Sequence, residues 1–579
     1  MGNVIRKIRA LLDRKQKITL LGLLLLMIIG AFLQMASVGV LVETVNVVID
    51  PEAVSNSRIA KAAYEWMGQP DFKIFSITVM ATLIFSFVIK NLFLYLQSKA
   101  TLAFVYVNQF RTSERMMRHY IKRPYEFYLN ADTAVIQRSI TSDVNNSYAL
   151  ILNLLHLMSD IFMAIFVVSF CLYKNGIMTI VMAVVMIALV VVIKKVLKPI
   201  MIQAGKDNQR YYSGLFKCIS QMVHGIKDVK VSGNEKTFVD EYDACGKGYV
   251  EAVQKYSLYN NIPKYLIETV CVTAMMLYLI VEILLGVSTG NTTESLSTLA
   301  AAAFVLLPAV NRISNEITSI TYLEPFLMGV AENLLGEVTD ESTDMTDYEK
   351  PAEKMKVEKE ITLRDITYAY PNTDRKIFDH ANLTIPIRKS VRIVGTTGAR
   401  KSTVVDIMLG LLKLQGGKVL ADDTDVTSNY RGWLKNVGYI PQMSYMLDDS
   451  IRRNVAFGVA TEQISDERVW EVLRDAQLDE FVSSLPDGLD TKIGERGIRL
   501  SGGQRQRISI ARALYEDPDI LILDEATSAV DNDTEAAIME SINRFQGKKT
   551  MLIIAHRLQT IEKCDMVYRV ENGVMKQER

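Results

Sequence analysis

The sequence has no excess charge of either sign, since 65 lysines and arginines balance 65 aspartates and glutamates over 579 residues. Its overall charge therefore gives no reason to expect a nucleic-acid partner. Cysteine is scarce and scattered, without a CxxC pair or a paired histidine. We interpret the cysteines as buried or lipid-facing thiols, not as metal ligands or disulfides. They are Cys171, Cys218, Cys245, Cys271 and Cys564.

Long apolar runs are missing after about Met328, whereas the chain before that point contains many of them. Hydrophobic residues make up 49% of the whole, and their concentration in this part indicates an all-α membrane domain. Six runs are each long enough to cross a hydrocarbon core of ~30 Å as a helix. We place these spans at residues 18–46, 73–105, 145–173, 177–204, 260–285 and 296–325.

The N-terminus begins as a secretory signal would, with basic residues followed by an apolar run. The run from Ile18 to Val42 exceeds the 7–15 apolar residues of a signal peptide, so we predict a retained first span. Positive charge gathers before the first span, after the second and after the fourth, and is nearly absent from the alternate loops. The positive-inside rule then places both termini in the cytoplasm. We expect the spans to cross the cytoplasmic (inner) membrane.

Several ionisable residues fall inside the predicted spans, where a charge costs about 2.5–3.5 kcal/mol on insertion scales, so each is a candidate functional residue. Lys90, Lys264 and Arg312 are cations, and they would suit an anionic substrate group such as a lipid phosphate. The alternatives are ion pairs, Lys90 with Glu43 and Arg312 with Glu316, or snorkelling to the membrane surface. Snorkelling is favoured for Lys264, which lies near a span end.

Two long segments between spans, residues 106–144 and 205–259, have few glycines or prolines and a helical pattern. We predict that they extend the membrane helices into the cytoplasm. The turn at Pro124–Phe127 is a candidate docking point for a cytoplasmic domain. An interfacial aromatic belt is the alternative explanation of the same residues.

The character of the chain changes after an acidic, polar stretch. We interpret residues 337–359 as a linker between a membrane domain (1–336) and a second domain (360–579). In the second domain short apolar runs alternate with helical stretches, which predicts an α/β fold with a largely parallel central sheet. The predicted strands are Ile361–Tyr370, Val391–Val394, Val437–Ile440, Ile520–Leu523 and Met551–Ile554.

One predicted strand leads into the sequence VGTTGARKST, residues 394–403, and an amphipathic helix from Ser402 to Leu412 is expected to follow. A strand, a glycine-bearing turn and a helix start point backbone N–H groups at an anion. Lys401 would reach the β- and γ-phosphates, and Ser402 would ligate magnesium. The spacing fits the phosphate-binding motif G-x-x-x-x-G-K-[ST] except at Arg400, where the motif has glycine.

Ionisable residues end two other predicted strands. Asp524 would hold magnesium or its water, and Glu525 would polarise an attacking water as general base. His556, after the next strand, would contact the γ-phosphate and fix Glu525 with that water. For Asp524 and Glu525 the alternative is an acidic pair that faces solvent, and for His556 it is a structural role. Leu500–Gln504 precedes the amphipathic run Arg505–Leu514 and offers a second anion site, better placed for the nucleotide of a neighbouring copy.

Together these motifs resemble the nucleotide-binding (P-loop ATPase) domain of an ABC transporter, and they occur in family order over about 220 residues. The resemblance implies ATP and Mg²⁺ as cofactors, Tyr370 as the residue that stacks on adenine, and a D-loop at residues 528–531. It implies these metal ligands: Ser402, Gln442 and Asp524. The nucleotide-binding residues that it implies are Tyr370, Gly395, Thr396, Thr397, Gly398, Ala399, Arg400, Lys401, Ser402, Thr403, Gln442, Leu500, Ser501, Gly502, Gly503, Gln504 and Asp531.

A six-span domain followed by one such domain resembles a bacterial exporter half-transporter, so two copies, expected to be identical, would form the working unit. Among these exporters the chain is most similar to the lipid-linked oligosaccharide flippases, through Pro308–Arg312, Ile262–Lys264 and the run YIPQMSYMLDDSIRRNVAFG. The resemblance implies ATP-driven flipping of an amphipathic, anionic, lipid-linked substrate. Lipid A and multidrug exporters share the same plan and are the alternatives. The spans exclude the soluble ABC ATPases of translation or DNA repair.

Arg400 is the departure from the family pattern that bears most on activity. A residue with a Cβ loses ~1–2 kcal/mol in a left-handed conformation, if the turn requires one. Three accounts of the loop are open: it adapts and hydrolysis proceeds, or weakened nucleotide binding gives a slow transporter, or the chain is an inactivated variant. The rival function from another class is a membrane regulator or channel that binds ATP with impaired hydrolysis. We favour weakened but real ATP use, because Glu525, His556 and the LSGGQ sequence are intact.

Overall fold

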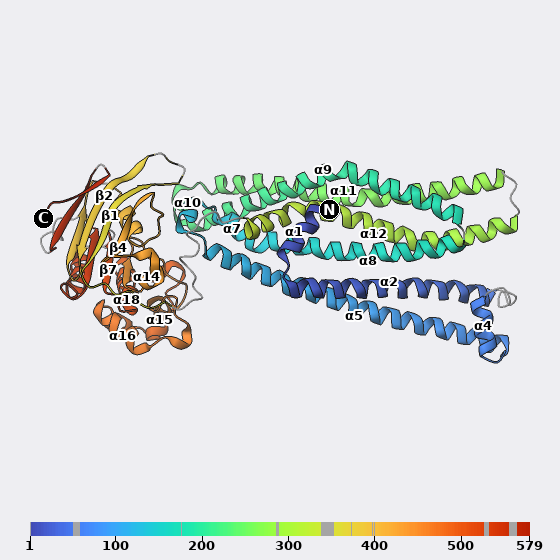
Figure 1. The fold of residues 1–579 in the computed structure, drawn as a ribbon, viewed down its shortest axis with the longest axis horizontal. Coiled ribbons are helices and arrows are strands. Elements are labelled where there is room, and N and C mark those ends of the chain that lie inside the picture. Colours follow the sequence, from blue (N-terminus) through green and yellow to red (C-terminus); the bar gives the residue numbers. More distant parts are fainter. Residues whose placement is uncertain are drawn as a thin grey trace. The chain divides into compact units, whose positions relative to one another are not determined.

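A computed structural model of the chain (Figure 1) describes residues 2–49, 58–174, 176–284, 289–336, 352–371, 373, 375–396, 398, 400–525, 532–554, 564–571 and 573–579. These residues divide into two compact units. The first comprises Met1–Ile121 and Ala131–Glu337, and the second comprises Lys122–Asn130 and Val338–Arg579. Each unit encloses its own clusters of buried apolar side chains.

The first unit is built from helices, and its long helices run side by side (Figure 1). Those of 31 to 50 residues are α2 (Arg14–Ile49), α5 (Phe72–Ile121), α8 (Val144–Lys174), α9 (Gly176–His224), α11 (Glu235–Leu284) and α12 (Thr289–Leu335). Shorter helices are α1 (Gly2–Leu11), α4 (Arg58–Trp66), α7 (Thr133–Arg138), α10 (Ile226–Ser232) and a π-helix (Ser139–Asp143). The most extensive pairings are α8 with α12 and α9 with α11.

Apolar length marks some of these helices as membrane spans. Within the described residues, 3 segments are long and apolar enough to cross a membrane: Arg14–Leu41, Phe72–Ile121 and Thr133–Ser169. They overlap the first three predicted spans. The other three predicted spans fall on α9, α11 and α12, so the number six stays a prediction. On α5, Ile84 and Leu92 are exposed, as suits a helix whose surroundings are apolar.

The two segments predicted as helical extensions are helical, with short interruptions. In the first, α5 ends at Ile121 and α7 begins at Thr133; in the second, α9 ends at His224 and α11 begins at Glu235. Gly233 ends α10 with φ +65°, a left-handed conformation that a Cβ disfavours. The chain therefore turns sharply here, and α9, α10 and α11 form one helical hairpin.

Within its described residues the second unit contains two sheets. One is antiparallel with strand order β2-β1-β4-β5, and the other has the order β10-β9-β3-β8-β7-β6. The larger sheet is parallel except for the pair β9–β10, which confirms the predicted central sheet. The strands are β1 (Glu360–Ala369), β2 (Lys376–Pro386), β3 (Ser390–Val394), β4 (Gly416–Ala421), β5 (Thr424–Asp425), β6 (Val437–Ile440), β7 (Ile520–Asp524), β8 (Thr550–Ile554), β9 (Met566–Glu571) and β10 (Val574–Gln577).

One predicted strand lies outside the parallel sheet. The run Ile361–Tyr370 forms β1, but it pairs with β2 and β4 in the antiparallel sheet instead of joining the parallel series. Its residues alternate between buried and more exposed positions, as in a sheet with one covered face. By contrast, β7 and β8 are buried along their whole length, as expected for parallel strands covered on both faces.

The helices of the second unit include one from the middle of the membrane-domain sequence. That helix is α6 (Tyr125–Asn130); the others are α13 (Lys401–Met408), α14 (Tyr430–Leu434), α15 (Ile451–Val455), α16 (Asp466–Asp475), α17 (Asp479–Ser484), α18 (Gly502–Tyr515) and α19 (Asn532–Asn543). Short 3-10 turns lie at Val426–Asn429, Thr461–Gln463, Gly488–Asp490 and Glu495–Gly497.

The predicted helix Ser402–Leu412 ends early, at Met408. Gly410 has φ +70°, and a Cβ there would lie 2.6 Å from the Tyr430 ring.

The predicted linker is described only at its C-terminal end. Residues 337–351 lie outside the described residues. Met355 is buried in the core of the second unit, and the Asp422 carboxylate accepts the backbone N–H groups of Glu358 and Lys359 at 2.9 and 2.8 Å. This end of the stretch is therefore part of the second unit, and the predicted boundaries at 336 and 359 stay predictions.

Candidate functional site

The predicted phosphate loop connects the end of β3 to the start of α13. Lys401 is buried at this helix start, and its ammonium donates to the carbonyl oxygens of Gly395 and Thr396 at 3.3 and 3.5 Å. Two carbonyl oxygens at the start of the loop thus face the Lys401 ammonium. Because N–H groups at a helix N-terminus carry partial positive charge, the ammonium and the helix start together suit an anionic ligand.

Arg400 lies directly before α13, and its backbone shows whether this turn requires a left-handed residue. Its backbone is left-handed, with φ +64° and ψ +34°. The turn therefore requires the conformation that favours glycine, and the arginine adopts it at a cost of ~1–2 kcal/mol. The guanidinium carbon lies 5.9 Å from the centroid of the Tyr370 ring, a cation–π arrangement.

Tyr370, the predicted adenine-stacking residue, lies at the edge of the same loop. Its hydroxyl is 2.9 Å from the hydroxyl of Thr403 on α13, and either can donate. Its ring meets Tyr368 edge to face at a centroid distance of 5.4 Å. The structure therefore brings Tyr370, Arg400 and Thr403 together.

Acidic groups lie next to the phosphate loop because β3 and β7 end at the same edge of the sheet. The Ser402 hydroxyl donates to Asp524 at 3.2 Å. Burial raises the pKa of Asp524 and Glu525 adds to the rise, while Ser402 and Lys401 lower it. Asp406 on α13 was not singled out from the sequence; burial and the Asp524 charge raise the pKa of Asp406 to about 6. Two partly desolvated carboxyls this close favour a cation.

Gln442 and Glu525 meet across the same edge. The Gln442 side-chain amide, after β6, donates to the Glu525 carboxylate at 2.8 Å. Glu525 has φ +48°, and its backbone N–H donates to Ile554 at 3.0 Å, so the end of β8 holds the glutamate. A left-handed residue directly after a buried strand is strained, and such strain is often found at functional sites.

The LSGGQ sequence opens α18 with a reciprocal cap. The Ser501 hydroxyl accepts the Gln504 backbone N–H at 3.2 Å, and the Gln504 side chain accepts the Ser501 backbone N–H at 2.8 Å. This capping box fixes the first turn of the helix. Ser501 is exposed at the surface of the unit, whereas Leu500 and Gly503 are buried.

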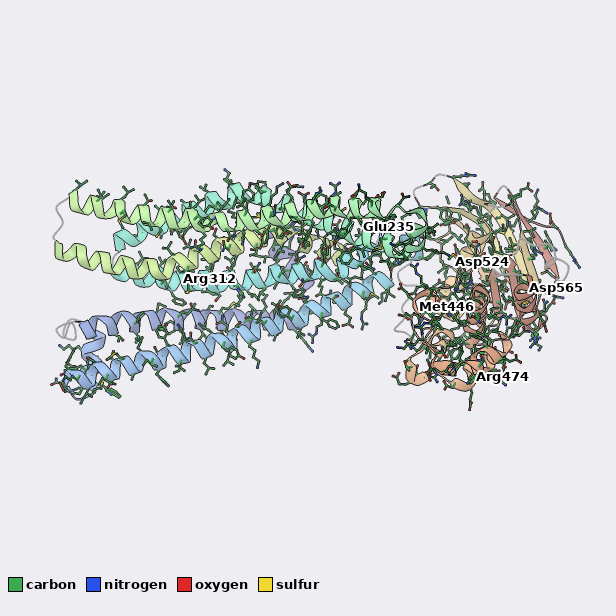
Figure 2. All side chains as sticks on the ribbon, turned by 180° about the vertical axis from the view of Figure 1, so that it is seen from behind. Glu235, Arg312, Met446, Arg474, Asp524 and Asp565 are labelled. Carbon is green, nitrogen blue, oxygen red and sulfur yellow. The ribbon has the colours of Figure 1, made fainter. Side chains whose placement is uncertain are left out.

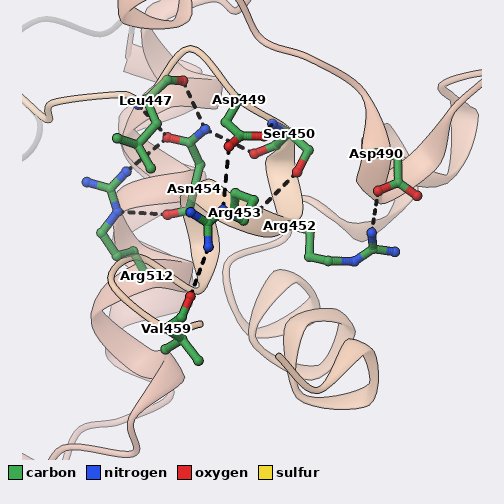
Figure 3. Close-up of polar contacts among 9 residues, drawn as sticks. All are labelled: Leu447, Asp449, Ser450, Arg452, Arg453, Asn454, Val459, Asp490 and Arg512. Atoms are coloured by element: carbon green, nitrogen blue, oxygen red, sulfur yellow. Dashed lines mark hydrogen bonds and ion pairs between the residues drawn. The ribbon is translucent and has the colours of Figure 1, made fainter. Parts of the chain in front are cut away.

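A buried amide ties α18 to the segment that follows Gln442 (Figure 3). The Asn454 side chain accepts the Leu447 backbone N–H at 2.8 Å and donates back to the Leu447 carbonyl at 3.1 Å. Arg512 on α18 donates to the Asn454 carbonyl at 2.8 Å and to its side-chain oxygen at 3.2 Å. Asn454 therefore sets the position of α18, and with it Ser501, against this segment.

Comparisons with known proteins agree with this geometry. The profile of the ABC transporter transmembrane region matches residues 15–306, and the ABC transporter profile matches residues 378–528. The chain is 30% identical over 471 residues to the ATP-dependent lipid A-core flippase of Escherichia coli K12, which covers 80% of this chain and 78% of that protein. The flippase of the same name from Shigella sonnei is 29% identical over 470 residues. The chain belongs to the ABC transporter family.

A solved structure supports the fold of the transporter. That of a bacterial Atm1-family ABC exporter with ATP bound matches it with a TM-score of 0.78, covering 98% of this chain and 96% of the other. At 21% identity, this likeness bears on the fold alone. The transporter thus fuses a transmembrane region to an ABC ATPase domain in one half-transporter, and it hydrolyses ATP to drive transport.

The segment Lys122–Asn130 belongs to the ATPase unit of the transporter, although it lies between membrane-domain helices in the sequence. Glu126 on α6 accepts the Tyr368 hydroxyl at 3.2 Å and the Lys413 backbone N–H at 3.0 Å. This supports the docking interpretation of the Pro124–Phe127 turn over an aromatic belt. The sequence signalled the turn through its proline and aromatics, but not the role of the glutamate.

Two of the three predicted substrate cations contact other side chains of the first unit. Arg312, part-way along the long helices (Figure 2), donates to both oxygens of Asp160 at 2.8 and 3.0 Å. Its partner is therefore on α8, and not the Glu316 considered from the sequence. The Lys90 ammonium lies 4.1 Å from the centroid of the Phe87 ring. Lys264 is exposed on α11.

Four predicted site residues and one expected partner have no described side chain. Thr397, Ala399, Asp531 and His556 lie outside the described residues, as does the rest of the D-loop. The side chain of Glu43, offered as a partner for Lys90, is also outside the described part. Their roles stay predictions.

Proposed function

We propose that the transporter uses ATP to move an amphipathic lipid with an anionic head group, similar to a lipid-linked oligosaccharide, across the inner membrane. Two identical half-transporters would form the unit, with their termini in the cytoplasm. The observation that carries the ATP part is the cluster of Lys401, Ser402 with Asp524, and Gln442 with Glu525 at one sheet edge. The similarity to flippases of a lipid supports the lipid part.

The donor set at this edge suits magnesium. Ser402, Gln442 and Asp524 offer oxygen ligands, which Mg²⁺ prefers, and a magnesium ion keeps several waters and phosphate oxygens of its own. Within the described residues no group of three or more histidine, cysteine, aspartate or glutamate side chains could hold a metal. The ion would arrive with the nucleotide. Bound there, it would neutralise charge on the phosphates.

The remaining residues divide between nucleotide binding and hydrolysis. Tyr370 would stack on the base, the loop from Gly395 to Thr403 would bind the phosphates, and Glu525 would polarise the attacking water with His556 in support. Asp531 and the sequence Leu500–Gln504 would act across the interface between two copies. Ser501, exposed at the start of a capped helix, supports that assignment.

Arg312 is the strongest candidate for the substrate pathway. It lies on a predicted span, and its side chain is half exposed. Its bidentate contact with Asp160 holds the guanidinium where an anionic head group could replace the carboxylate. An anionic head group would compete with Asp160 for the guanidinium. Lys90 and Lys264 would add positive potential along the same pathway. The alternative is a structural ion pair between α12 and α8.

Two rival functions use the same architecture. A lipid A-type or multidrug exporter is compatible with the relatives, and a membrane regulator that binds ATP with impaired hydrolysis is suggested by Arg400. The regulator requires Arg400 to let ATP bind but to prevent its productive hydrolysis. Its guanidinium instead lies over the Tyr370 ring, which favours an exporter with somewhat weakened ATP use.

ATPase measurements on purified protein in lipid test the first part of the proposal. We expect slow but measurable hydrolysis by the unmodified chain, a higher rate for Arg400→Gly, and a loss of about 100-fold or more for Glu525→Gln. Glu540→Gln, an exposed glutamate of the same unit, serves as the matched control. No hydrolysis in either the unmodified chain or Arg400→Gly would refute ATP-driven transport.

Native mass spectrometry of co-purified lipid, followed by a flipping assay in vesicles, tests the substrate. We expect an anionic lipid-linked glycan to be retained, and Arg312→Gln to reduce flipping while basal ATP hydrolysis continues. Asp160→Asn separates the two explanations of Arg312. If the pair is only structural, this change impairs the protein as Arg312→Gln does; if Arg312 binds substrate, flipping continues.

A further inference from the structure

The helices α8 and α12 lie side by side in a fixed register (Figure 1). Arg312 of α12 bonds to both carboxylate oxygens of Asp160 on α8. Further along, a Cβ placed on Gly329 of α12 would lie 3.8 Å from the carboxylate of Asp143, directly before α8. The two contacts are separated by equal numbers of residues on the two helices, so the helices are antiparallel and stay in step between them.

The same register continues on the other side of the ion pair, where Met163 of α8 and Ala309 of α12 belong to one buried cluster. It places His156, four residues before Asp160, opposite Glu316, which lies equally far along α12 from the ion pair. Residues four apart lie on one face of a helix, with Cβ atoms about 5–6 Å apart. His156 therefore lies beside two carboxyl groups, that of Asp160 on its own helix and that of Glu316 on the facing helix.

Glu316 and His156 differ in their access to water. The Glu316 side chain is only 9% exposed, and its Oε2 atom has no hydrogen-bond partner in the described part of the chain. A buried carboxylate without a donor is costly, so its surroundings favour a proton or a nearby cation. His156 is exposed, and an ionisable side chain on a membrane span faces the bundle interior or a water-filled cavity. It can therefore exchange protons with water.

The other elements packed against α8 leave this pair of carboxyl groups as the acidic neighbours of His156 among the described residues. The facing stretch of α2, residues 20–31, contains no ionisable residue. On α5 and α9 the ionisable residues at this level are exposed: Lys99, Tyr106, Lys194 and Lys195. A proton on His156 would therefore act on Asp160 and Glu316.

We propose that His156 is a positioning residue of the substrate site, which links the binding of an anionic head group to the uptake of one proton. This rests on the proposed role of Arg312 in binding substrate. Neutral imidazole donates one hydrogen bond, whereas imidazolium donates from both nitrogens. Protonated His156 can bond to Asp160 and Glu316 together, and Asp160 then releases Arg312 to the head group. While His156 is neutral, Asp160 keeps the guanidinium.

The charge of the site balances in this exchange. The pair of Arg312 and Asp160 is neutral as the structure shows it. An anion that takes over the guanidinium leaves Asp160 without its partner inside the membrane domain, where an unpaired charge is unfavourable. One proton bound by an imidazole nitrogen of His156 keeps the total charge of the site unchanged. The proton returns to water when the anion leaves.

Calorimetry on the full-length transporter in phosphatidylcholine nanodiscs tests the proposal. The probe is a short-chain phosphatidylglycerol, because its phosphodiester keeps its charge between about pH 5 and 8, where imidazole titrates. Arg312→Gln measures binding outside the site, which is subtracted. We expect the remaining binding to be about three- to tenfold tighter at about pH 6 than at about pH 8. Titrations in buffers of different ionisation enthalpy should show uptake of about one proton per bound lipid.

Variants of the site should change this pH profile in opposite directions. His156→Gln cannot become charged, so binding should be weak at both pH values, without proton uptake. His156→Lys keeps a cation and Asp160→Asn frees the guanidinium, so both should bind tightly at both pH values. His224→Gln, which changes an exposed histidine of α9, is the matched control and should leave the profile unchanged.

The outcomes separate this proposal from the substrate site on which it rests. Binding that depends on Arg312 but not on pH, or a normal pH profile in His156→Gln, would overturn the role of His156 alone. If His156→Gln does not fold, a normal profile in His156→Lys or Asp160→Asn would overturn it equally. The same binding by Arg312→Gln and the unmodified chain at both pH values would refute the substrate site, and this inference with it.

Discussion

At the scale of the residue, Arg400 shows how replacing the motif's glycine affects the backbone and the nucleotide site. The turn before α13 needs a left-handed residue, and an arginine occupies it with φ +64°. The residue therefore keeps the backbone that the motif's glycine would have, while its side chain lies beside Tyr370. The departure affects stability through the backbone and nucleotide binding through the guanidinium, and the two effects can be measured separately.

We predict that Arg400→Gly is more stable than Arg400→Ala by about 1 kcal/mol, because both remove the guanidinium but alanine retains the Cβ. Thermal unfolding of the full-length protein measures the difference. Gly398→Ala is the matched control: Gly398 has φ +84° with open space around it, so its substitution should cost a similar amount through the backbone alone. Equal stability of the two Arg400 variants would show that the left-handed turn is not strained.

At the scale of the element, two polar contacts position whole helices. Glu126 holds α6 to the ATPase unit through two hydrogen bonds to a carboxylate. Asn454 holds the segment after Gln442 to α18 from a fully buried position. In both contacts one side chain bonds two elements together. Loss of that side chain should therefore change transport coupling or protein stability, without removing a nucleotide contact.

For Glu126→Ala we expect weaker transport with nearly unchanged ATP binding, because α6 loses hydrogen bonds worth about 1.5–3 kcal/mol to a charged acceptor. Vesicle transport and nucleotide titration measure the two effects. Glu114→Ala, an exposed glutamate paired with Arg118 on α5, should change neither. Normal transport by Glu126→Ala would mean that the docking of α6 is dispensable.

Asn454→Ala should destabilise the ATPase unit by about 2–4 kcal/mol, since Leu447 and Arg512 each lose a buried partner. We expect a lower midpoint of thermal unfolding, which added ATP does not restore fully. The exposed Ser484→Ala should stay within about 0.5 kcal/mol of the unmodified chain. An unshifted midpoint for Asn454→Ala would show that water replaces the amide without loss.

At the scale of the whole molecule, the proposed pair of copies shares its ATP sites. Each site would combine Lys401 of one copy with Ser501 of the other. Mixed dimers of Lys401→Ala and Ser501→Arg chains would then keep one intact site, whereas a double-variant chain paired with an unmodified chain keeps none. We expect roughly half the ATPase activity in the first case and almost none in the second.

Purified mixed dimers, isolated with two different affinity tags, measure this prediction. Each single variant paired with itself should be inactive and supplies the control. If the pattern is reversed, so that the double-variant dimer keeps about half the activity and the first mixed dimer keeps almost none, then each site lies within one copy, and the proposal of shared sites is wrong.

Much of the second unit could be predicted from local sequence. The strands β3, β6, β7 and β8 appear within one residue of their predicted bounds, because short apolar runs between turns can form little else. The phosphate loop was predicted from its strand–turn–helix pattern, from spacing that fits the motif except at Arg400, and from the other motifs of the second domain. The run Ile361–Tyr370 is a strand, as its alternation predicted, but alternation identifies a half-covered strand and not its neighbours, so only the structure placed it in the antiparallel sheet.

The sequence alone determined that this chain has an apolar helical half and an α/β half, and it identified the residues that flank the phosphate loop, since these depend on periodicity and spacing. Only the tertiary structure decided that Arg400 is left-handed, that Arg312 pairs with Asp160, and that α6 belongs to the ATPase unit. Each of these involves either a backbone angle or residues far apart in the chain. Sequence spacing does not encode such contacts, because the packing of whole elements sets them.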